Sequence, residues 1–230
     1  MGTLYIVATP IGNLKDITLR AIEILKEADF ILCEDSRQTI KLLQKYGISK
    51  PLVSYFQHSK VAKTDYILEQ LEKGKKLALV TDAGTPGISD PGNQLIELVV
   101  SRLPDVQIIP LPGPSALVAA LSVSGFPTDK FIFMGFPPQK KGREKFFKKV
   151  AEAEYTVTFY ESTHRILKTL EQLGKSLKTN TFNLKPNIVV CRELTKKFET
   201  IYRGSVDEII EQLNKDKNAL KGEFVIAVWK

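Results

Sequence analysis

The strongest constraint on the fold is the alternation of short apolar runs with amphipathic stretches in the first half of the chain. Apolar runs of strand length occupy residues 4–8, 30–33, 52–54, 77–80 and 106–109. Helical patterns fill residues 18–28, 36–46, 61–72 and 93–102, and in the second of these Ser36 is expected to cap the helix and Gly47 to end it. Strands alternating with helices form parallel sheets covered on both faces. The chain is therefore predicted to be an α/β protein with a mostly parallel sheet in its N-terminal domain.

The second half of the chain has more consecutive strands and shorter links. Strands are expected at residues 131–134, 156–160, 188–191, 200–202 and 224–229, and helices at 115–124, 139–151, 163–173 and 206–213, with a polar linker at 175–187. Short links favour a mixed sheet in this C-terminal domain. Three prolines and a glycine within residues 110–115 mark the expected boundary. The predicted domains are residues 1–113 and 114–230.

The loops that follow several strands are rich in glycine, proline and small polar residues. They occupy residues 9–13, 34–37, 81–93, 112–115 and 161–165, and the longest reads TDAGTPGISDPGN. Glycines allow close backbone approach, and ligands of open α/β sheets bind at the carboxyl ends of strands. Residues 81–93 alone are equally consistent with an ordinary long connection. The recurrence of similar loops favours a site for a flat, partly apolar cofactor.

Several common chemistries lack their sequence signatures. The first strand is followed by ATPIGN rather than GxGxxG, and no GxxxxGK[ST] loop occurs, which disfavours dinucleotide and ATP chemistry. No nucleophile elbow, HExxH pair or cysteine-rich metal spacing is present. Cys33 and Cys191 each end an apolar run, so both are expected to pack in the core. No metal site is predicted.

The charge of the chain is unevenly distributed. Residues 1–115 carry 13 basic and 13 acidic side chains, so the formal net charge of +7 lies in residues 116–230. This asymmetry suits an anionic partner such as nucleic acid, although many soluble proteins are mildly basic without one. No apolar run approaches the ~20 residues that span a bilayer, and the first residues lack the pattern of a signal peptide. A cytoplasmic protein without membrane contact is expected.

Seven motifs in order identify a family resemblance along nearly the whole chain. They read GTLYIVATPIGNL, EDSRQT, TDAGTPGISDPG, PGPSAL, FYESTHR, RELTKKFET and KGEFV. Together they resemble the ribosomal RNA small subunit 2′-O-ribose methyltransferase I family of the tetrapyrrole methylase superfamily. The resemblance implies a two-domain fold, S-adenosylmethionine as methyl donor in the cleft between the domains, and a homodimer. It also implies 2′-O-methylation of a cytidine in the decoding region of small-subunit ribosomal RNA, either free or within the 30S subunit.

The same resemblance assigns residues to the donor site. Carried over position by position, these are Pro10, Ala83, Gly84, Thr85, Ile88, Ser115, Ala116, Tyr160, Glu161 and Leu194. Residues 83–86 read Ala-Gly-Thr-Pro where tetrapyrrole-type relatives typically have Gly-Gly-Asp-Pro, which favours the RNA branch over the porphyrin branch. The alternatives are a small-molecule methyltransferase of the tetrapyrrole type and a non-catalytic RNA-binding or ribosome-assembly factor.

Residues 139–149 carry six basic side chains against one acidic side chain. Given the family, Lys140, Lys141, Arg143 and Lys145 are expected to contact RNA phosphates, whereas Phe146 and Phe147 are expected in the core. Arg37 either binds a phosphate or pairs with Glu34 and Asp35, and the same choice applies to Arg192, Glu193 and Lys196. His58 and His164 are the two histidines, and either a proton-accepting or a structural role is open to them. The general base is not assigned.

Overall fold

The structure is a computed structural model that describes residues 1–56, 61–180 and 187–229. The chain divides into two compact units, Met1–Ser115 and Ala116–Lys230, hereafter unit 1 and unit 2. The division falls after Ser115, two residues beyond the predicted boundary, which lay after residue 113.

Unit 1 is built on a five-stranded sheet in the order β3-β2-β4-β1-β5. All of its pairs are parallel, which confirms the predicted parallel sheet. The strands are β1 (Thr3–Val7), β2 (Phe30–Cys33), β3 (Leu52–Ser54), β4 (Lys76–Leu79) and β5 (Gln107–Leu111). Every residue of β1 is buried because this inner strand is covered on both faces.

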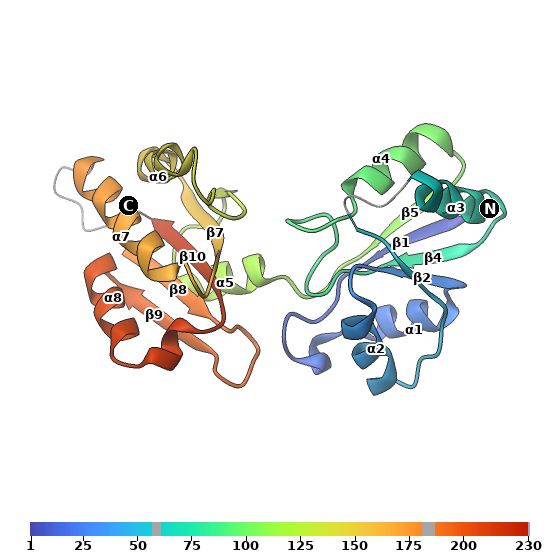
Figure 1. Ribbon diagram of the computed structural model, residues 1–230, viewed down its shortest axis with the longest axis horizontal. Coiled ribbons are helices and arrows are strands. Elements are labelled where there is room, and N and C mark those ends of the chain that lie inside the picture. The colour runs from blue at the N-terminus through green and yellow to red at the C-terminus, as the bar shows by residue number, and fades with distance from the viewer. Residues whose placement is uncertain (57–60, 181–186, 230) are drawn as a thin grey trace. The chain divides into compact units, whose positions relative to one another are not determined.

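The helices of unit 1 lie on both faces of this sheet (Figure 1). They are α1 (Leu19–Glu27), α2 (Ser36–Lys45), α3 (Val61–Glu72) and α4 (Asn93–Arg102), preceded by the short 3-10 helix η1 (Leu14–Asp16). The connections through α1 and α2 run toward β3, whereas those through α3 and α4 run toward β5. Because such crossovers are right-handed, the two pairs of helices must cover opposite faces.

The side chains of β1 alternate between the two cores that result. Tyr5 and Val7 pack with Leu25 of α1, whereas Leu4 packs with Leu71 of α3 on the other face. This is the two-residue period of a strand. The apolar run of β1 is continuous for that reason.

The start of α2 differs from the prediction. Asp35, not Ser36, is the N-cap, and its carboxylate accepts from the backbone N–H of Arg37 at 2.9 Å. A negative charge is also favoured at the positive end of the helix dipole, which a serine hydroxyl does not supply. The other end is as predicted: Gly47 adopts φ 62° just beyond the helix.

Unit 2 contains a five-stranded sheet in the order β6-β7-β10-β8-β9. Its strands are β6 (Phe131–Phe133), β7 (Thr156–Ser162), β8 (Asn187–Arg192), β9 (Thr200–Gly204) and β10 (Glu223–Trp229). The β6–β7 pair is parallel and the other pairs are antiparallel, which confirms the predicted mixed sheet.

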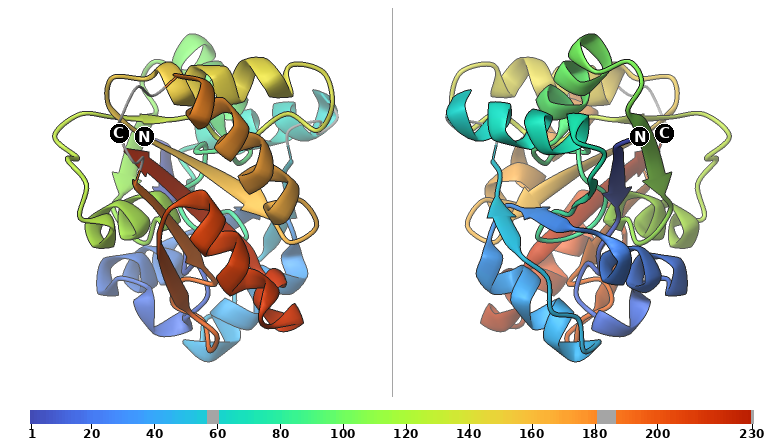
Figure 2. Two further views of the ribbon diagram at one scale, coloured as in Figure 1. Left: turned by 90° about the vertical axis from the view of Figure 1, so that its left-hand side faces the viewer. Right: turned by 90° about the vertical axis from the view of Figure 1, so that its right-hand side faces the viewer.

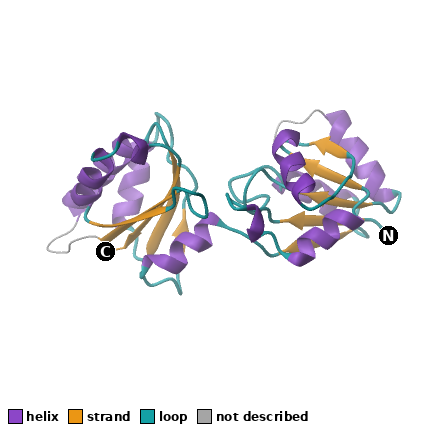
Figure 3. Ribbon diagram, turned by 90° about the horizontal axis from the view of Figure 1, so that it is seen from below, coloured by secondary structure: helices purple, strands orange, loops and turns teal. Residues whose placement is uncertain are grey.

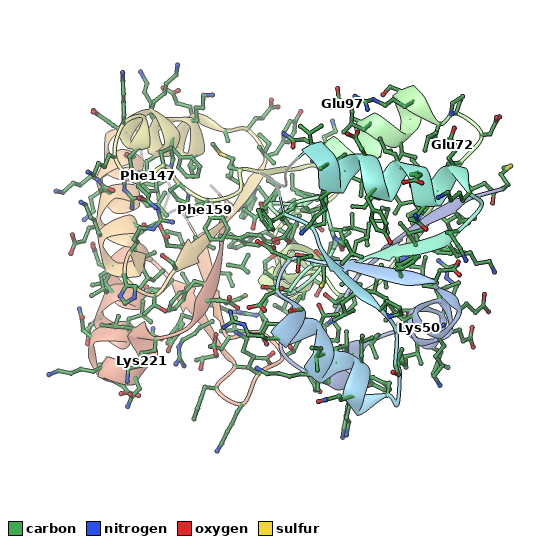
Figure 4. All side chains as sticks on the ribbon, turned by 45° about the vertical axis from the view of Figure 1, so that its right-hand side comes forward. Lys50, Glu72, Glu97, Phe147, Phe159 and Lys221 are labelled. Atoms are coloured by element: carbon green, nitrogen blue, oxygen red, sulfur yellow. The ribbon has the colours of Figure 1, made fainter. Side chains whose placement is uncertain are left out.

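The helices of unit 2 are α5 (Ala116–Ser124), α6 (Arg143–Glu152), α7 (Ile166–Asn180) and α8 (Val206–Asn214), with a 3-10 helix η2 (Lys217–Leu220). Figures 2 and 3 show helices packed against both faces of the sheet. The face with α6, α7 and α8 holds the main core, in which Phe147 and Phe159 meet at 6.3 Å between ring centroids (Figure 4). Helix α5 contacts β7 and β10 but gives no residue to that core, so it covers the opposite face.

Helix α7 begins and ends later than predicted. Its apolar residues Ile166, Leu170, Leu173 and Leu177 follow a helical spacing and are all buried. The burial of Leu177 carries the helix to Asn180, so the prediction of a linker is wrong for residues 175–180. Residues 181–186 of that expected linker lie outside the described residues.

Candidate functional site

The order of the strands in unit 1 defines where a ligand site is expected. Strands β1 and β4 are neighbours, but the helices that follow them, α1 and α4, lie on opposite faces. Such a position is a topological switch point, and ligands of open α/β sheets bind there, outside the carboxyl ends of the strands. The candidate site is therefore centred on the loops that follow β1 and β4.

These two loops are joined by a pair of backbone hydrogen bonds. The N–H of Thr9 donates to the carbonyl of Gly84 at 2.8 Å, and the N–H of Gly84 donates to the carbonyl of Thr9 at 3.0 Å. The hydroxyl of Thr9 also donates to the carbonyl of Thr81 at 2.9 Å. Gly84 adopts φ 85°, a conformation that favours glycine. The loops that leave toward opposite faces are thus held together at the switch point.

The neighbouring strand ends are linked to the same place. The N–H of Asp35, after β2, donates to Oδ1 of Asp82 at 3.1 Å, and the hydroxyl of Thr85 donates to the carbonyl of Pro114, after β5, at 3.5 Å. Gly113 approaches β1 so closely that an added Cβ would lie 2.9 Å from the Cβ of Ala8. The ends of four adjacent strands therefore form one connected rim.

The predicted donor residues of unit 1 belong to this rim. Pro10 is buried beside Thr9, and Gly84 and Thr85 make the contacts just described. Ala83 and Ile88 are exposed next to them, and Ile88 has 46% of its surface accessible. Ser115 follows Pro114 at the end of unit 1, and Ala116 begins α5 of unit 2.

Four carboxyl groups lie on the rim: Glu34, Asp35, Asp82 and Asp90. Burial, the nearby Glu34 and then Asp82 raise the pKa of Asp90 to about 6, against the opposing effect of Thr81. Burial followed by Asp82 and Asp35 also raises the pKa of Glu34. Hydrogen bonds from Arg37 instead lower the pKa of Asp35 to about 2. Asp90 belongs to the loop at residues 81–93 that the sequence marked as a possible ligand site, but its motif does not reveal that it is partly buried among other acids.

In unit 2 the predicted residue Glu161 forms an internal ion-pair network. Its side chain is fully buried and pairs with Arg165 at 2.7 Å and with Arg143 at 3.8 Å. The hydroxyl of Thr169 donates to Oε2 at 2.5 Å, and the N–H of Ser162 donates to Oε1 at 2.7 Å. These contacts fix the loop that follows β7.

Arg143 differs from the lysines beside it in sequence. Lys140, Lys141 and Lys145 are exposed, whereas the Arg143 side chain is only 6% exposed. Its guanidinium donates to Gln172, to the carbonyl of Pro138 and to Thr169. The structure therefore places Arg143 inside unit 2, where it is not available to a phosphate. The sequence did contain the signal, because Arg143 shares a helical face with Phe146, Phe147 and Val150, all buried.

The other predicted residues of unit 2 lie at one edge of its sheet. Glu161 and Arg192 are both paired with Phe224, one on each side of β10, so the ends of β7 and β8 lie at the same edge. Tyr160 is half-buried there and its ring lies 4.9 Å from Phe133 and 5.4 Å from Phe136. Leu194 is buried in the loop that follows β8.

The remaining candidates have simpler surroundings. Arg37 pairs with Asp35 at 2.6 Å while its side chain stays 85% exposed. His164 is exposed, and His58 lies outside the described residues. Cys33 and Cys191 are buried as predicted, and burial raises the pKa of Cys191 to about 11. Among the described residues no group of His, Cys, Asp and Glu could hold a metal ion. No helix in the described part of the chain is long and apolar enough to cross a membrane.

Two solved structures of similar fold are those of methyltransferases. The chain matches a cobalamin biosynthetic enzyme, cobalt precorrin-4 methyltransferase, with a TM-score of 0.68 and 19% identity, covering 98% of this chain and 94% of that one. It matches uroporphyrin-III-C-methyltransferase from Thermus thermophilus with a TM-score of 0.65 and 16% identity, covering 99% and 94%. These likenesses confirm the predicted α/β fold.

The sequence defines the class more closely. The model of the tetrapyrrole (corrin/porphyrin) methylases matches residues 3–210. Ribosomal RNA small subunit methyltransferase I of Escherichia coli O157:H7 is 44% identical over 228 residues, which cover 99% of this chain and 77% of that protein. The protein of the same name from Thermotoga maritima is 44% identical over 217 residues, which cover 94% of each chain. This chain belongs to the tetrapyrrole methylase family and, within it, to the ribosomal RNA small subunit methyltransferase I group.

Replacing Arg143 is expected to destabilise unit 2. Arg143→Met removes one partner of the buried Glu161 and leaves the acceptors on Pro138 and Gln172 unpaired, so the free energy of unfolding should fall by about 3 kcal/mol. Urea unfolding can be followed by the fluorescence of Trp229, the sole tryptophan. Lys145→Met is the matched control on the same helix and should change the free energy by less than about 0.5 kcal/mol. Equal effects of the two substitutions would contradict the placement of Arg143.

The raised pKa of Asp90 predicts a pH-dependent difference between the wild type and Asp90→Asn. Protonated Asp90 is favoured by folding, so its contribution to stability is complete below its unfolded pKa, near 4, and is lost as pH rises through about 6. Asp90→Asn should therefore unfold with a free energy about 1–2 kcal/mol larger at pH 7.5, allowing for solvent screening. Below pH 4 the two proteins should be equally stable. A constant difference across this range would show that Asp90 titrates normally.

Proposed function

We propose that this protein transfers a methyl group from S-adenosylmethionine to small-subunit ribosomal RNA, at the ribose 2′-hydroxyl of a cytidine in the decoding region. The observation that carries the proposal is 44% identity along nearly the whole chain to proteins named ribosomal RNA small subunit methyltransferase I. The motifs that build the rim of unit 1 lie inside this matched span. The specific nucleotide and the 2′-hydroxyl come from the family resemblance of those motifs.

The rim residues fit this donor. S-adenosylmethionine supplies an activated methyl group on a positively charged sulfur. Ala83 is small and exposed beside the paired backbone of Gly84 at the switch point, and the exposed side chain of Ile88 offers an apolar surface to an adenine ring. The carboxyl groups of Glu34, Asp82 and Asp90 make the rim electronegative, which favours a cationic ligand.

The residues of the chain contribute mainly by positioning. Transfer of a methyl group to a hydroxyl is an in-line displacement, so its rate depends on how well both reactants are held. The paired backbones of Thr9 and Gly84 and the contact of Thr85 with Pro114 hold the donor loops in one arrangement. In unit 2 the Glu161 network does the same for the loop after β7. Neither set of contacts has to form during the reaction.

The proposed RNA contacts are electrostatic. Lys140, Lys141 and Lys145 are exposed in the unit that carries the excess positive charge, and they are proposed to bind phosphates. Arg37 is proposed as a further phosphate contact, since its guanidinium remains exposed while paired with Asp35. The resemblance further supports a homodimer, and a ribosomal substrate supports a cytoplasmic location.

A second candidate is methylation of a small tetrapyrrole-like molecule. The fold is shared with a cobalt precorrin-4 methyltransferase and a uroporphyrin-III-C-methyltransferase, which favours this alternative. The identity to those proteins is 19% and 16%, far below the 44% to the ribosomal RNA group. The third candidate, an RNA-binding factor without catalysis, predicts no binding of the donor.

The first test is transfer of labelled methyl from S-adenosylmethionine to small ribosomal subunits that lack their modifications. Mass spectrometry of the digested RNA should show 2′-O-methylcytidine. Thr85→Trp should abolish the product because the indole fills the donor loop, whereas Val100→Trp, on the exposed face of α4, should leave it unchanged. Donor binding without incorporation into any ribosomal particle would exclude the RNA acceptor and direct attention to tetrapyrroles.

If these lysines bind phosphates, a variant that lacks them should bind RNA with an affinity that depends less on salt than that of the wild type. The slope of log K against log[salt] is negative. If Lys140, Lys141 and Lys145 each neutralise a phosphate, replacing all three by glutamine should reduce the magnitude of this slope by about 2. The matched control replaces Lys73, Lys75 and Lys76, three exposed or half-buried lysines at the amino end of β4 in unit 1. An equal loss of slope in both triple variants would mean that the effect reflects net charge alone.

A further inference from the structure

The loop at residues 193–199, which joins β8 to β9, presents an aromatic side chain to solvent. Phe198 is 61% exposed, the largest exposed fraction of any aromatic side chain in the described part of the chain. The ammonium group of Lys197 lies 5.5 Å from the centroid of its ring. An exposed ring beside a cation does not contribute to the core, so packing does not account for this pair, and a role in binding is considered for it.

A buried arginine, Arg192, holds this loop through hydrogen bonds to backbone carbonyls. The side chain of Arg192 donates to the carbonyls of Lys221, Phe198 and Asn218 at 2.7, 3.1 and 2.7 Å. Arg192 itself is only 8% exposed. The position of Lys221, one of its three partners, can be seen in Figure 4. These bonds satisfy the guanidinium within the protein and hold the backbone of Phe198 in place. The sequence left open whether Arg192 binds a phosphate. In the structure its guanidinium instead binds three backbone carbonyls and holds the loop.

Further contacts hold the rest of the loop. Lys196 donates to Glu193 of the loop at 2.9 Å and to Glu223 of β10 at 2.8 Å, so its charge is paired within unit 2. The N–H of Thr195 donates to the carboxylate of Glu199 at 2.5 Å. Glu193 and Thr195 adopt φ 52° and 67°, which side chains other than glycine rarely do. These bonds hold the loop in a conformation in which Phe198 is exposed.

We propose that Phe198 is a stacking platform for an unpaired base of the RNA substrate, with Lys197 directed to an adjacent phosphate. Single-stranded RNA is recognised by aromatic rings that stack on splayed bases and by cations along the backbone. Phe198 lies in the same loop as Leu194, which is a proposed donor contact, and in the unit that carries the positive excess. A base held here lies at the edge of the sheet where β7 and β8 end. The inference rests on the proposed function for the identity of the partner.

A second copy of the chain is the competing occupant of this surface. Protein interfaces are depleted of lysine at their centres, whereas the ammonium group of Lys197 lies 5.5 Å from the centroid of the Phe198 ring. RNA is therefore the better match to the chemistry. The competing possibility is decided by the oligomeric state of the variants.

The chain offers a matched control for this pair. Tyr155 is 38% exposed, and Lys130 lies 5.4 Å from its ring centroid, so this pair also places a lysine ammonium beside an exposed aromatic ring. Tyr155 and Lys130 immediately precede β7 and β6, and therefore lie at the opposite edge of the sheet. A general effect of exposed aromatics would appear at both places.

The experiment measures the affinity for a short fluorescein-labelled single-stranded RNA by fluorescence anisotropy, with donor binding measured by calorimetry. Phe198→Ala and Phe198→Leu should each weaken RNA binding by about 5- to 100-fold, because one stacked base is lost. Phe198→Trp should retain it, and Tyr155→Ala should bind as the wild type does. Donor affinity and oligomeric state should be unchanged in all four variants.

Wild-type affinity of Phe198→Ala or Phe198→Leu would overturn the inference, as would dissociation of an oligomer by Phe198→Ala. These outcomes are separate from the fate of the proposed function, which is tested by methylation of small subunits by the wild-type protein. Methylation with an unaltered Kd in Phe198→Ala rejects the stacking platform alone. Absence of methylation together with a weakened Kd in Phe198→Ala rejects the enzymatic assignment and keeps the RNA contact.

Discussion

The arrangement of the candidate site depends on the two backbone hydrogen bonds between Thr9 and Gly84. They join the loops after β1 and β4 at the point where the chain reverses its direction across the sheet. Right-handed crossovers would otherwise carry these loops toward opposite faces. The bonds involve main-chain atoms, so they constrain the path of the chain rather than one rotamer. The contacts of Asp82 and Thr85 extend this constraint to the ends of β2 and β5.

Unit 2 reaches a similar result with charged side chains. Glu161 is completely buried, and it is tolerated because Arg165, Arg143 and Thr169 satisfy its oxygens. Arg192 holds the next loop through three carbonyls. Unit 1 therefore fixes its strand-end loops mainly by backbone pairing, and unit 2 by buried ions. Loss of one ion partner should be the more damaging change, because the remaining charge stays in the interior.

Much of the fold could be predicted from periodicity, because strands and helices differ in the spacing of their apolar residues. The helix Val61–Glu72 was predicted in this way, whereas the mixed sheet of unit 2 was predicted from the short links between its consecutive strands. At the site, errors arose where a polar residue had a tertiary role. Arg143 read as one of several basic residues, although its helical face is the buried one. The raised pKa of Asp90 comes from its burial and from acids of separate loops, and no local pattern contains that information.

The position of β10 in unit 2 has a consequence for how the chain is made. It is the last described strand in sequence and lies in the middle of its sheet, between β7 and β8. The strands of unit 1 all come from the first 111 residues, so that sheet is complete while the ribosome is still translating. Unit 2 must wait for residues 223–229 before β7 and β8 can pair through a common neighbour. Until then both strands have open edges, and such edges can pair with other chains.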